Sequence, residues 1–219
     1  AVKFRNIELI KLIMNHPKFD PSLSLLDYAF MLSVNSKDIF KILIEAKSLD
    51  VNYFHAYQNT NDNKNDIQYP MIKKAKKDEF TTPLIKATKK GDLTIIKAII
   101  DHPSFDPNRS HITSCLFIAI EKNDLTLFKF FLDLNNGDIN IKNMKNQSPL
   151  FAASSSGNSE ILQEILGNQK FDPVKSNIQN SFINSSNIES MKLLVAYDEE
   201  HGKNFLSFDK IYLLSRLNY

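Results

Sequence analysis

The sequence predicts an all-α protein made of repeated helix-turn-helix units. One six-residue phrase occurs three times, as HPKFDP at 16–21, HPSFDP at 102–107 and NQKFDP at 168–173. Asp106 and Asp172 of this phrase lie 66 residues apart, twice 33, and a period of that size is typical of stacked repeats. Asp50 and Asp138 occupy related positions in weaker copies, and the long step from Asp50 to Asp106 indicates an insertion.

An amphipathic segment precedes each copy of the phrase and is the second observation behind this fold class. Apolar residues recur three and four apart, while a Lys or Gln occupies a fixed place on the opposite side, which predicts a helix with one buried face. The segments are 6–14, 37–44, 92–100, 124–132, 158–166 and 187–195.

A shorter helix is expected before three of these segments. The blocks are TPLIKA at 82–87, SCLFIA at 114–119 and SPLFAA at 148–153. Thr or Ser followed by Pro is typical of an N-cap and first helical position. The turn after each block carries a residue suited to left-handed backbone and then a capping residue: Gly91 and Asp92, Asn123 and Asp124, Gly157 and Asn158. Each repeat is therefore predicted to be helix, tight turn, helix.

The repeated phrase is interpreted as the end of the second helix. His16 and His102 are expected in its last turn, where the negative end of the helix dipole favours them, and the following Pro stops the helix. The aspartate is expected to begin the outgoing turn. An apolar residue at one fixed position is expected to wedge into the core: Phe19, Phe105, Phe171 and Leu49.

These blocks resemble the ankyrin repeat family. The segment 81–108 is similar to one whole unit of that family, with Ile85 where the family's histidine would stand. The resemblance implies an ankyrin-type helix-turn-helix solenoid with short β-hairpin fingers or loops between repeats. About five to six divergent units are expected, and the family's use as a protein-binding module implies a concave groove and finger loops that hold a partner.

A single repeat domain is expected over 1–219. Its parts are a partial first repeat at 1–22, a second repeat at 23–52, an inserted loop at 53–79, repeats at 80–110, 111–144 and 145–176, and an eroded last repeat with a C-terminal cap at 177–219. The insertion contains an aromatic cluster, and two interpretations stay open: these side chains pack the insertion onto the second repeat, or they bind a partner. They include Tyr53, Phe54 and Tyr57.

The resemblance places candidate partner-binding residues in the groove and on the fingers. Groove positions precede each inner turn and are Lys89, Lys90, Glu121, Lys122, Ser155 and Ser156. Finger positions are Arg109, His111, Lys142, Asn143 and Lys145. Several are cationic, which favours an acidic or phosphorylated protein partner. The alternative is that these lysines are ordinary solvated surface.

Composition excludes several other classes of partner and place. The net charge is +2 and arginine is rare, which argues against a nucleic-acid-binding protein. No apolar run is long enough for a membrane span. A single cysteine, Cys115, forms no internal disulfide and favours a reducing, intracellular compartment, with the cytoplasm as the expected location. A monomer is expected.

Chemistry-bearing patterns are weak, and neither a cofactor nor a metal is expected. The five histidines and Cys115 show no metal-ligand spacing, and a calcium loop starting at Asn61 would place Asp66 and Ile72 where Gly and Glu are required. Cys115 is expected at a helix start rather than as a nucleophile. We expect a non-catalytic interaction module or scaffold; the alternatives are a regulatory or targeting domain of a larger enzyme or channel and, least favoured, an enzyme.

Overall fold

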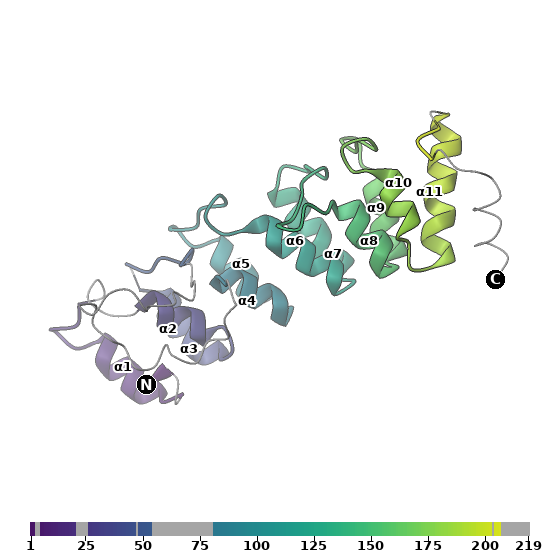
Figure 1. The fold of residues 1–219 in the computed structure, drawn as a ribbon. Coiled ribbons are helices and arrows are strands. Elements are labelled where there is room, and N and C mark those ends of the chain that lie inside the picture. The colour runs from purple at the N-terminus through teal and green to yellow at the C-terminus, as the bar shows by residue number, and fades with distance from the viewer. Residues whose placement is uncertain (3–4, 21–25, 47, 54–80, 203, 207–219) are drawn as a thin grey trace, which may run out of the picture. The chain divides into compact units, whose positions relative to one another are not determined.

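The computed structural model describes residues 1–2, 5–20, 26–46, 48–53, 81–202 and 204–206 (Figure 1). Every regular element in these residues is a helix, so the all-α class is confirmed there. The chain divides into two compact units, Ala1–His111 and Ile112–Tyr219. No helix among the described residues is both long and apolar enough to cross a membrane.

The first unit contains two helical hairpins and one further helix. Its helices are α1 (Ile7–Met14), α2 (Leu26–Ser33), α3 (Lys37–Ile44), α4 (Pro83–Lys90) and α5 (Leu93–Ile100). Helix α2 packs on α3 and α4 packs on α5; the first helices α2 and α4 also contact each other, as do the second helices α3 and α5. Apolar side chains such as Phe30, Ile39, Leu84 and Ile96 are buried between them.

The second unit repeats this arrangement. Its helices are α6 (Ile112–Glu121), α7 (Leu125–Leu134), α8 (Pro149–Ser156), α9 (Ser159–Leu166), α10 (Ile178–Ile183) and α11 (Ile188–His201). Hairpins α6–α7, α8–α9 and α10–α11 lie in sequence order, with α8 between α6 and α10 and α9 between α7 and α11. Phe128, Phe131, Leu162 and Leu194 are among the residues that fill the core.

The predicted helix signals work locally as expected at most positions. Thr82 and Ser148 cap α4 and α8 by accepting hydrogen bonds from the backbone N–H of Ile85 and Phe151. A left-handed residue closes the first helix of the pairs α4–α5, α6–α7 and α8–α9: Gly91 has φ 76°, Asn123 φ 52° and Gly157 φ 71°. Asp92 and Asp124 cap α5 and α7 in the same way. Each cap satisfies a helix N–H that has no partner within the helix.

Two expectations about helix starts are wrong. The side chain of Asn158 makes no cap bond; its amide instead donates to the carbonyl of Ile120, a buried group that has greater need of a partner. Helix α6 starts at Ile112, ahead of the expected Ser114, so Cys115 lies inside the helix, where its side chain is fully buried. A buried thiol of this kind is a small apolar filler.

The repeated phrase also differs from expectation. His16 and His102 lie two residues beyond the ends of α1 and α5, not in the last turn. There Nδ1 accepts from the backbone N–H of Lys18 or Ser104, as Oδ1 of Asn168 does from Lys170.

The apolar position of the phrase is less uniform than predicted. Leu49 is buried, but Phe19, Phe105 and Phe171 are only half-buried, so the core wedge is confirmed for Leu49 alone. No strand occurs in the described residues, and the connections between repeats there are loops. Phe54 and Tyr57 lie outside the described residues, whereas Tyr53 is half-buried and lies edge-to-face with Tyr28, their ring centroids 6.5 Å apart.

Candidate partner-binding surface

The loops between repeats are held by a recurrent aspartate turn. A carboxylate oxygen accepts a hydrogen bond from the backbone N–H two residues later in four copies, starting at Asp50, Asp106, Asp138 and Asp172, with distances of 2.9 to 3.0 Å. This side-chain-to-backbone bond fixes the direction in which the chain leaves the helix pair. The prediction that the aspartate begins a turn is confirmed at these four positions.

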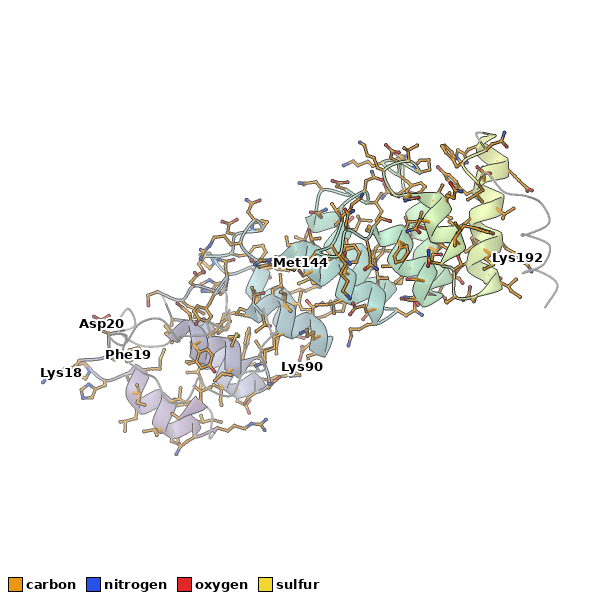
Figure 2. The ribbon with its side chains drawn as sticks, in the orientation of Figure 1. Lys18, Phe19, Asp20, Lys90, Met144 and Lys192 are labelled. Atoms are coloured by element: carbon orange, nitrogen blue, oxygen red, sulfur yellow. The ribbon has the colours of Figure 1, made fainter. Side chains whose placement is uncertain are left out.

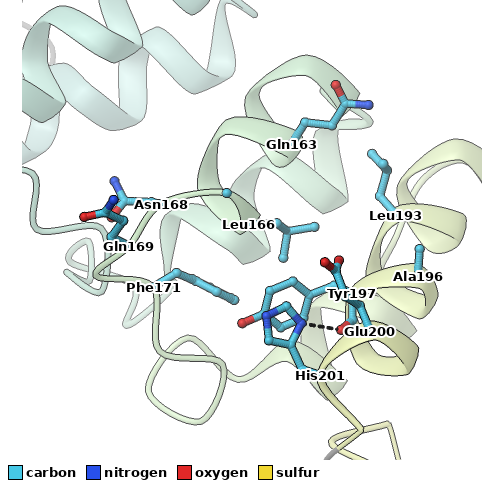
Figure 3. A pocket seen from close by; sticks show the side chains of 11 residues that line it. Gln163, Leu166, Asn168, Gln169, Phe171, Leu193, Ala196, Tyr197, Glu200 and His201 are labelled. Atoms are coloured by element: carbon cyan, nitrogen blue, oxygen red, sulfur yellow. Dashed lines mark hydrogen bonds between the residues drawn. The ribbon is translucent and has the colours of Figure 1, made fainter.

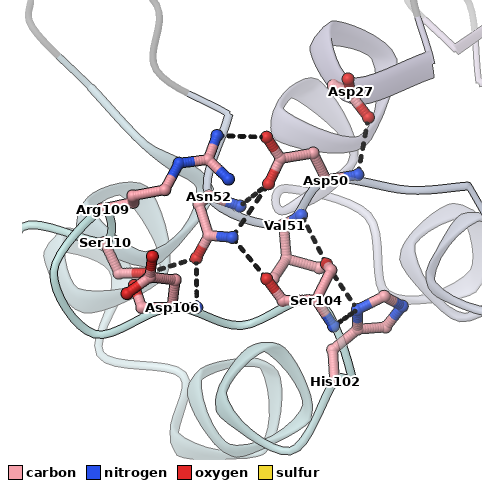
Figure 4. A network of polar contacts seen from close by, with 9 residues as sticks. All are labelled: Asp27, Asp50, Val51, Asn52, His102, Ser104, Asp106, Arg109 and Ser110. Atoms are coloured by element: carbon pink, nitrogen blue, oxygen red, sulfur yellow. Dashed lines mark hydrogen bonds and ion pairs between the residues drawn. The ribbon is translucent and has the colours of Figure 1, made fainter.

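In the first unit, Asn52 joins one loop to the next (Figure 4). Its side chain is 1% exposed. Oδ1 accepts from the backbone N–H of Asp106 at 2.8 Å and from the hydroxyl of Ser110 at 2.6 Å, while Nδ2 donates to the carbonyl of Ser104 at 2.6 Å. One amide therefore satisfies three groups more than fifty residues away in the sequence.

Asn140 repeats this linkage in the second unit. Its Oδ1 accepts from the backbone N–H of Asp172 at 2.9 Å and from the hydroxyl of Ser176 at 3.1 Å, and its Nδ2 donates to the carbonyl of Lys170 at 2.6 Å. The Lys170 ammonium donates to the carbonyl of Asn136 in return. Loops 135–147 and 167–177 are thus fastened side by side.

Two large apolar side chains and four lysines are exposed on these two loops, and we call this set the paired-loop surface. It consists of Lys142, Met144, Lys145, Lys170, Val174 and Lys175. Met144, which is labelled in Figure 2, and Val174 are both large apolar residues. Met144 is nevertheless 90% exposed and Val174 73% exposed. The four lysines are exposed as well. Apolar patches rimmed by polar residues mark interaction sites, and Met144 and Val174 are candidates for such a patch.

The acidic residues of these loops are committed to holding the loop backbone. Hydrogen bonds from the backbone N–H groups of Lys175 and Val174 hold the pKa of the Asp172 carboxyl below its ordinary value, so it stays ionised. The Lys175 ammonium lies 3.7 Å from the same carboxylate. The Asp138 carboxylate accepts a hydrogen bond from the backbone N–H of Asn140. The four lysines outnumber these two carboxylates, and the paired-loop surface is therefore cationic.

Sequence reasoning selected Lys142 and Lys145 but missed Met144, Val174, Lys170 and Lys175. The signal was an apolar residue directly before a lysine inside a turn-forming stretch, as in Met144-Lys145 and Val174-Lys175.

Asn143, a predicted finger residue, acts on the loop backbone. Its Oδ1 accepts hydrogen bonds from the backbone N–H groups of Lys145 and Gln147 at 2.9 and 3.0 Å. Asn143 therefore shapes the loop that carries Met144.

The other predicted finger residues lie in the first unit. Arg109 donates to Asp50 at 2.6 Å, which raises the pKa of the guanidinium. Burial acts to raise the pKa of the Asp50 carboxyl, but hydrogen bonds from Arg109 and Asn52 outweigh it and leave the pKa lowered. His111 is exposed and has a left-handed φ of 56°. Arg109 is thus engaged within its own unit.

The predicted groove residues fall into two sets. Lys89 and Lys90 belong to the first unit, and Glu121, Lys122, Ser155 and Ser156 to the second. All are exposed except Ser155, which is half-buried and donates to the carbonyl of Ala152 at 3.2 Å. Lys90, at the end of α4 (Figure 2), donates to the carbonyl of Val34 at 3.2 Å and lies 3.8 Å from Asp92. Lys90 therefore links α4 to the preceding hairpin.

Asp92 should make the first unit sensitive to acid. Burial raises the pKa of its carboxyl, but the hydrogen bond from Lys37, the backbone N–H of Ile95 and the charge of Lys90 outweigh burial and hold the pKa below 3.8. A lowered folded-state pKa stabilises the fold above the unfolded-state value, and this stability is lost as the pH falls through the folded value.

We expect Asp92→Asn to lower the free energy of unfolding at pH 7 by less than about 1 kcal/mol, because both lysines are partly exposed. The difference should shrink as the pH falls below 3.8. Urea unfolding followed by circular dichroism across this pH range measures it. Asp133→Asn, at an exposed position on α7, should show no such loss, and a deficit that persists unchanged in acid would contradict the role of the Asp92 charge.

Comparison with known proteins adds no family to this description. No family model, no curated protein and no solved structure matches this chain. Within the described ranges, no three His, Cys, Asp or Glu side chains come together as they would to hold a metal ion. The candidate functional site in the described residues is the paired-loop surface.

Proposed function

We propose that this chain is an ankyrin-type repeat protein, a solenoid of helical hairpins that binds a protein partner and performs no catalysis. The ankyrin resemblance rests on the repeated motif blocks of the sequence, and the regular contacts between successive hairpins inside each unit support it. The observation that carries the proposed binding function is the paired-loop surface, where Met144 is 90% exposed between lysines.

The loops are built to hold this surface in place before a partner arrives. Asn140 fastens one loop to the other, and Asp138 and Asp172 fix the turns. A surface that is already ordered loses little conformational entropy on binding. Met144 adds an adaptable apolar contact, because its unbranched side chain adjusts to different partners.

The chemistry of the surface selects an acidic partner segment. An apolar residue of the partner would cover Met144 and Val174, while neighbouring carboxylates or phosphoryl groups would pair with Lys142, Lys145 and Lys175. Complementary charge speeds association and disfavours basic partners. An intracellular, cytoplasmic setting accords with the single free thiol, Cys115.

Selection from a random peptide display library with the intact chain tests this function. Peptides with Asp or Glu around one apolar residue should be enriched, and the double change Lys142→Glu/Lys145→Glu should weaken a selected peptide about 10- to 100-fold, by loss of charge pairing. Lys41→Glu/Lys97→Glu, the same change at exposed positions on α3 and α5, is the matched control.

A third variant tests whether the selected peptide binds at the paired-loop surface or at the predicted groove residues. The triple change Lys89→Glu/Lys90→Glu/Lys122→Glu should leave the affinity of the selected peptide within about twofold, since those residues lie outside the paired-loop surface. Enrichment of basic peptides, or equal affinity for the Lys142→Glu/Lys145→Glu variant and wild type, would overturn the proposed site. Loss of binding only in the triple variant would move the site to the groove.

A further inference from the structure

Helix α11, the second helix of the last pair, is longer than the second helices of the earlier pairs. Its last residue is His201, and Gly202 caps it with a φ of 59°. The corresponding helix α9 ends at Leu166. In sequence register, residues 196–201 of α11 correspond to the loop residues 167–172 that follow α9. Helix α11 is not followed by the proline-containing phrase found after α1, α5 and α9, and it runs on for more than another turn.

The extension of α11 forms one side of a cavity that is open to solvent and lies beside the loop that follows α9 (Figure 3). Its volume is about 630 Å³, large enough for a long side chain with part of its backbone. Leu166, Phe171, Leu193 and Tyr197 supply the apolar part of the lining. Gln163, Gln169 and Glu200 add polar groups from both sides, all three on exposed residues.

An aromatic wall forms one side of this cavity. The rings of Tyr197 and His201 are stacked, with centroids 4.1 Å apart and planes at 22°. His201 Nδ1 donates to the Tyr197 carbonyl at 2.8 Å, which fixes its ring. Phe171 lies edge-to-face against Tyr197, at 5.3 Å and 79°. Three rings are therefore fixed beside the open volume, and the negative face of a phenyl or phenol ring attracts cations.

The formal charge in the described lining of the cavity is negative. Glu200 is the charged side chain in the described lining, and Lys and Arg do not contribute to that lining. Burial, followed by the nearby carboxylates of Asp172 and Glu200, raises the pKa of the Tyr197 hydroxyl. The same negative field stabilises any cation that enters.

We propose that this cavity binds the cationic side chain of a partner peptide, and that arginine is the side chain it fits best. A guanidinium stacks on aromatic rings and presents several N–H donors, which the oxygens of Glu200, Gln163 and Gln169 accept. The aliphatic part of arginine covers Leu166 and Leu193. This site shares the loop after α9 with the paired-loop surface, but its lining contains none of that surface's residues and its charge preference is the opposite, so the proposal does not depend on that surface.

Nuclear magnetic resonance of the intact, isotope-labelled chain tests the proposal with a defined probe, N-acetyl-arginine N-methylamide. The chain has five histidines, so the His201 ring signal can be assigned by its loss in His201→Gln. We expect saturable shifts of this signal and of the backbone amides at 166–171. The citrulline analogue, a neutral isostere, should bind about tenfold more weakly. Equal binding of the two probes, or no saturable shift, would overturn the proposal.

Two variants distinguish a direct contact with Glu200 from the general effect of negative charge near the cavity. Glu200→Gln should weaken the arginine probe about five- to tenfold. Glu199→Gln removes the same charge from the neighbouring exposed residue, which does not line the cavity, and should change binding less than about twofold. Equal losses in the two variants would overturn the assignment of the contact to Glu200. Binding of the citrulline probe by both variants serves as a check that the cavity is intact.

Discussion

Asn52→Ala is expected to lower the free energy of unfolding of the first unit by about 3 kcal/mol, the largest effect of any polar replacement considered. The change leaves the backbone N–H of Asp106 and the carbonyl of Ser104 without their partner, whereas the hydroxyl of Ser110 keeps the carbonyl of Asp106 as an acceptor. Both groups are partly buried between the loops, and an unsatisfied buried polar group costs about 1–3 kcal/mol. Urea unfolding followed by far-ultraviolet circular dichroism measures the loss.

Replacing an exposed asparagine at the equivalent position is the control for Asn52→Ala. Asn108→Ala changes an asparagine at the same position of the next aspartate turn, where the side chain is exposed, and should cost less than about 0.5 kcal/mol. Hydrogen exchange supplies a local measurement, because the Asp106 amide should lose protection in Asn52→Ala and keep it in Asn108→Ala. Equal destabilisation by both replacements would show that burial of the amide is not the source of the effect.

Gly157→Ala is expected to destabilise the second unit by about 2–3 kcal/mol. Gly157 has a φ of 71°, and left-handed backbone costs a residue with a Cβ about 1–2 kcal/mol. The added methyl would also meet Asn187 Nδ2 at 2.6 Å and Ser186 Oγ at 2.8 Å. Asn187 donates to the Gly157 carbonyl and caps α11, so its displacement adds the loss of a helix cap. Thermal unfolding by circular dichroism gives the comparison.

Gly202→Ala separates the two parts of this cost. Gly202 has a similar φ of 59° but no atom within 4 Å of the position of an added Cβ. It should therefore lose only the backbone contribution, about 1 kcal/mol. If both alanine variants are destabilised equally, contact with Asn187 and Ser186 is not a significant part of the effect at Gly157.

Much of the fold could be predicted because its signals are local. Caps such as Thr82 and Asp92 act on an N–H three residues away, and Gly91 or Gly157 closes a helix through its own backbone angle. The apolar spacing identifies the buried face of each second helix for the same reason. Only part of the candidate site was predictable: Lys142 and Lys145 follow from register, but the exposure of Met144 and Val174 required coordinates.

The amino-acid sequence alone determined the class of structure, the order of helices and turns, and the aspartates that begin the loops. Tertiary structure decided which backbone group each side-chain amide binds. Asn158 donates to the carbonyl of Ile120 and does not cap α9, and Asn52 and Asn140 bind groups in the next loop. It also decided that α11 lines an open cavity. The physical reason is that a buried polar group must find a hydrogen-bond partner. In these three cases the partner lies about thirty residues away or more, beyond the reach of local sequence signals.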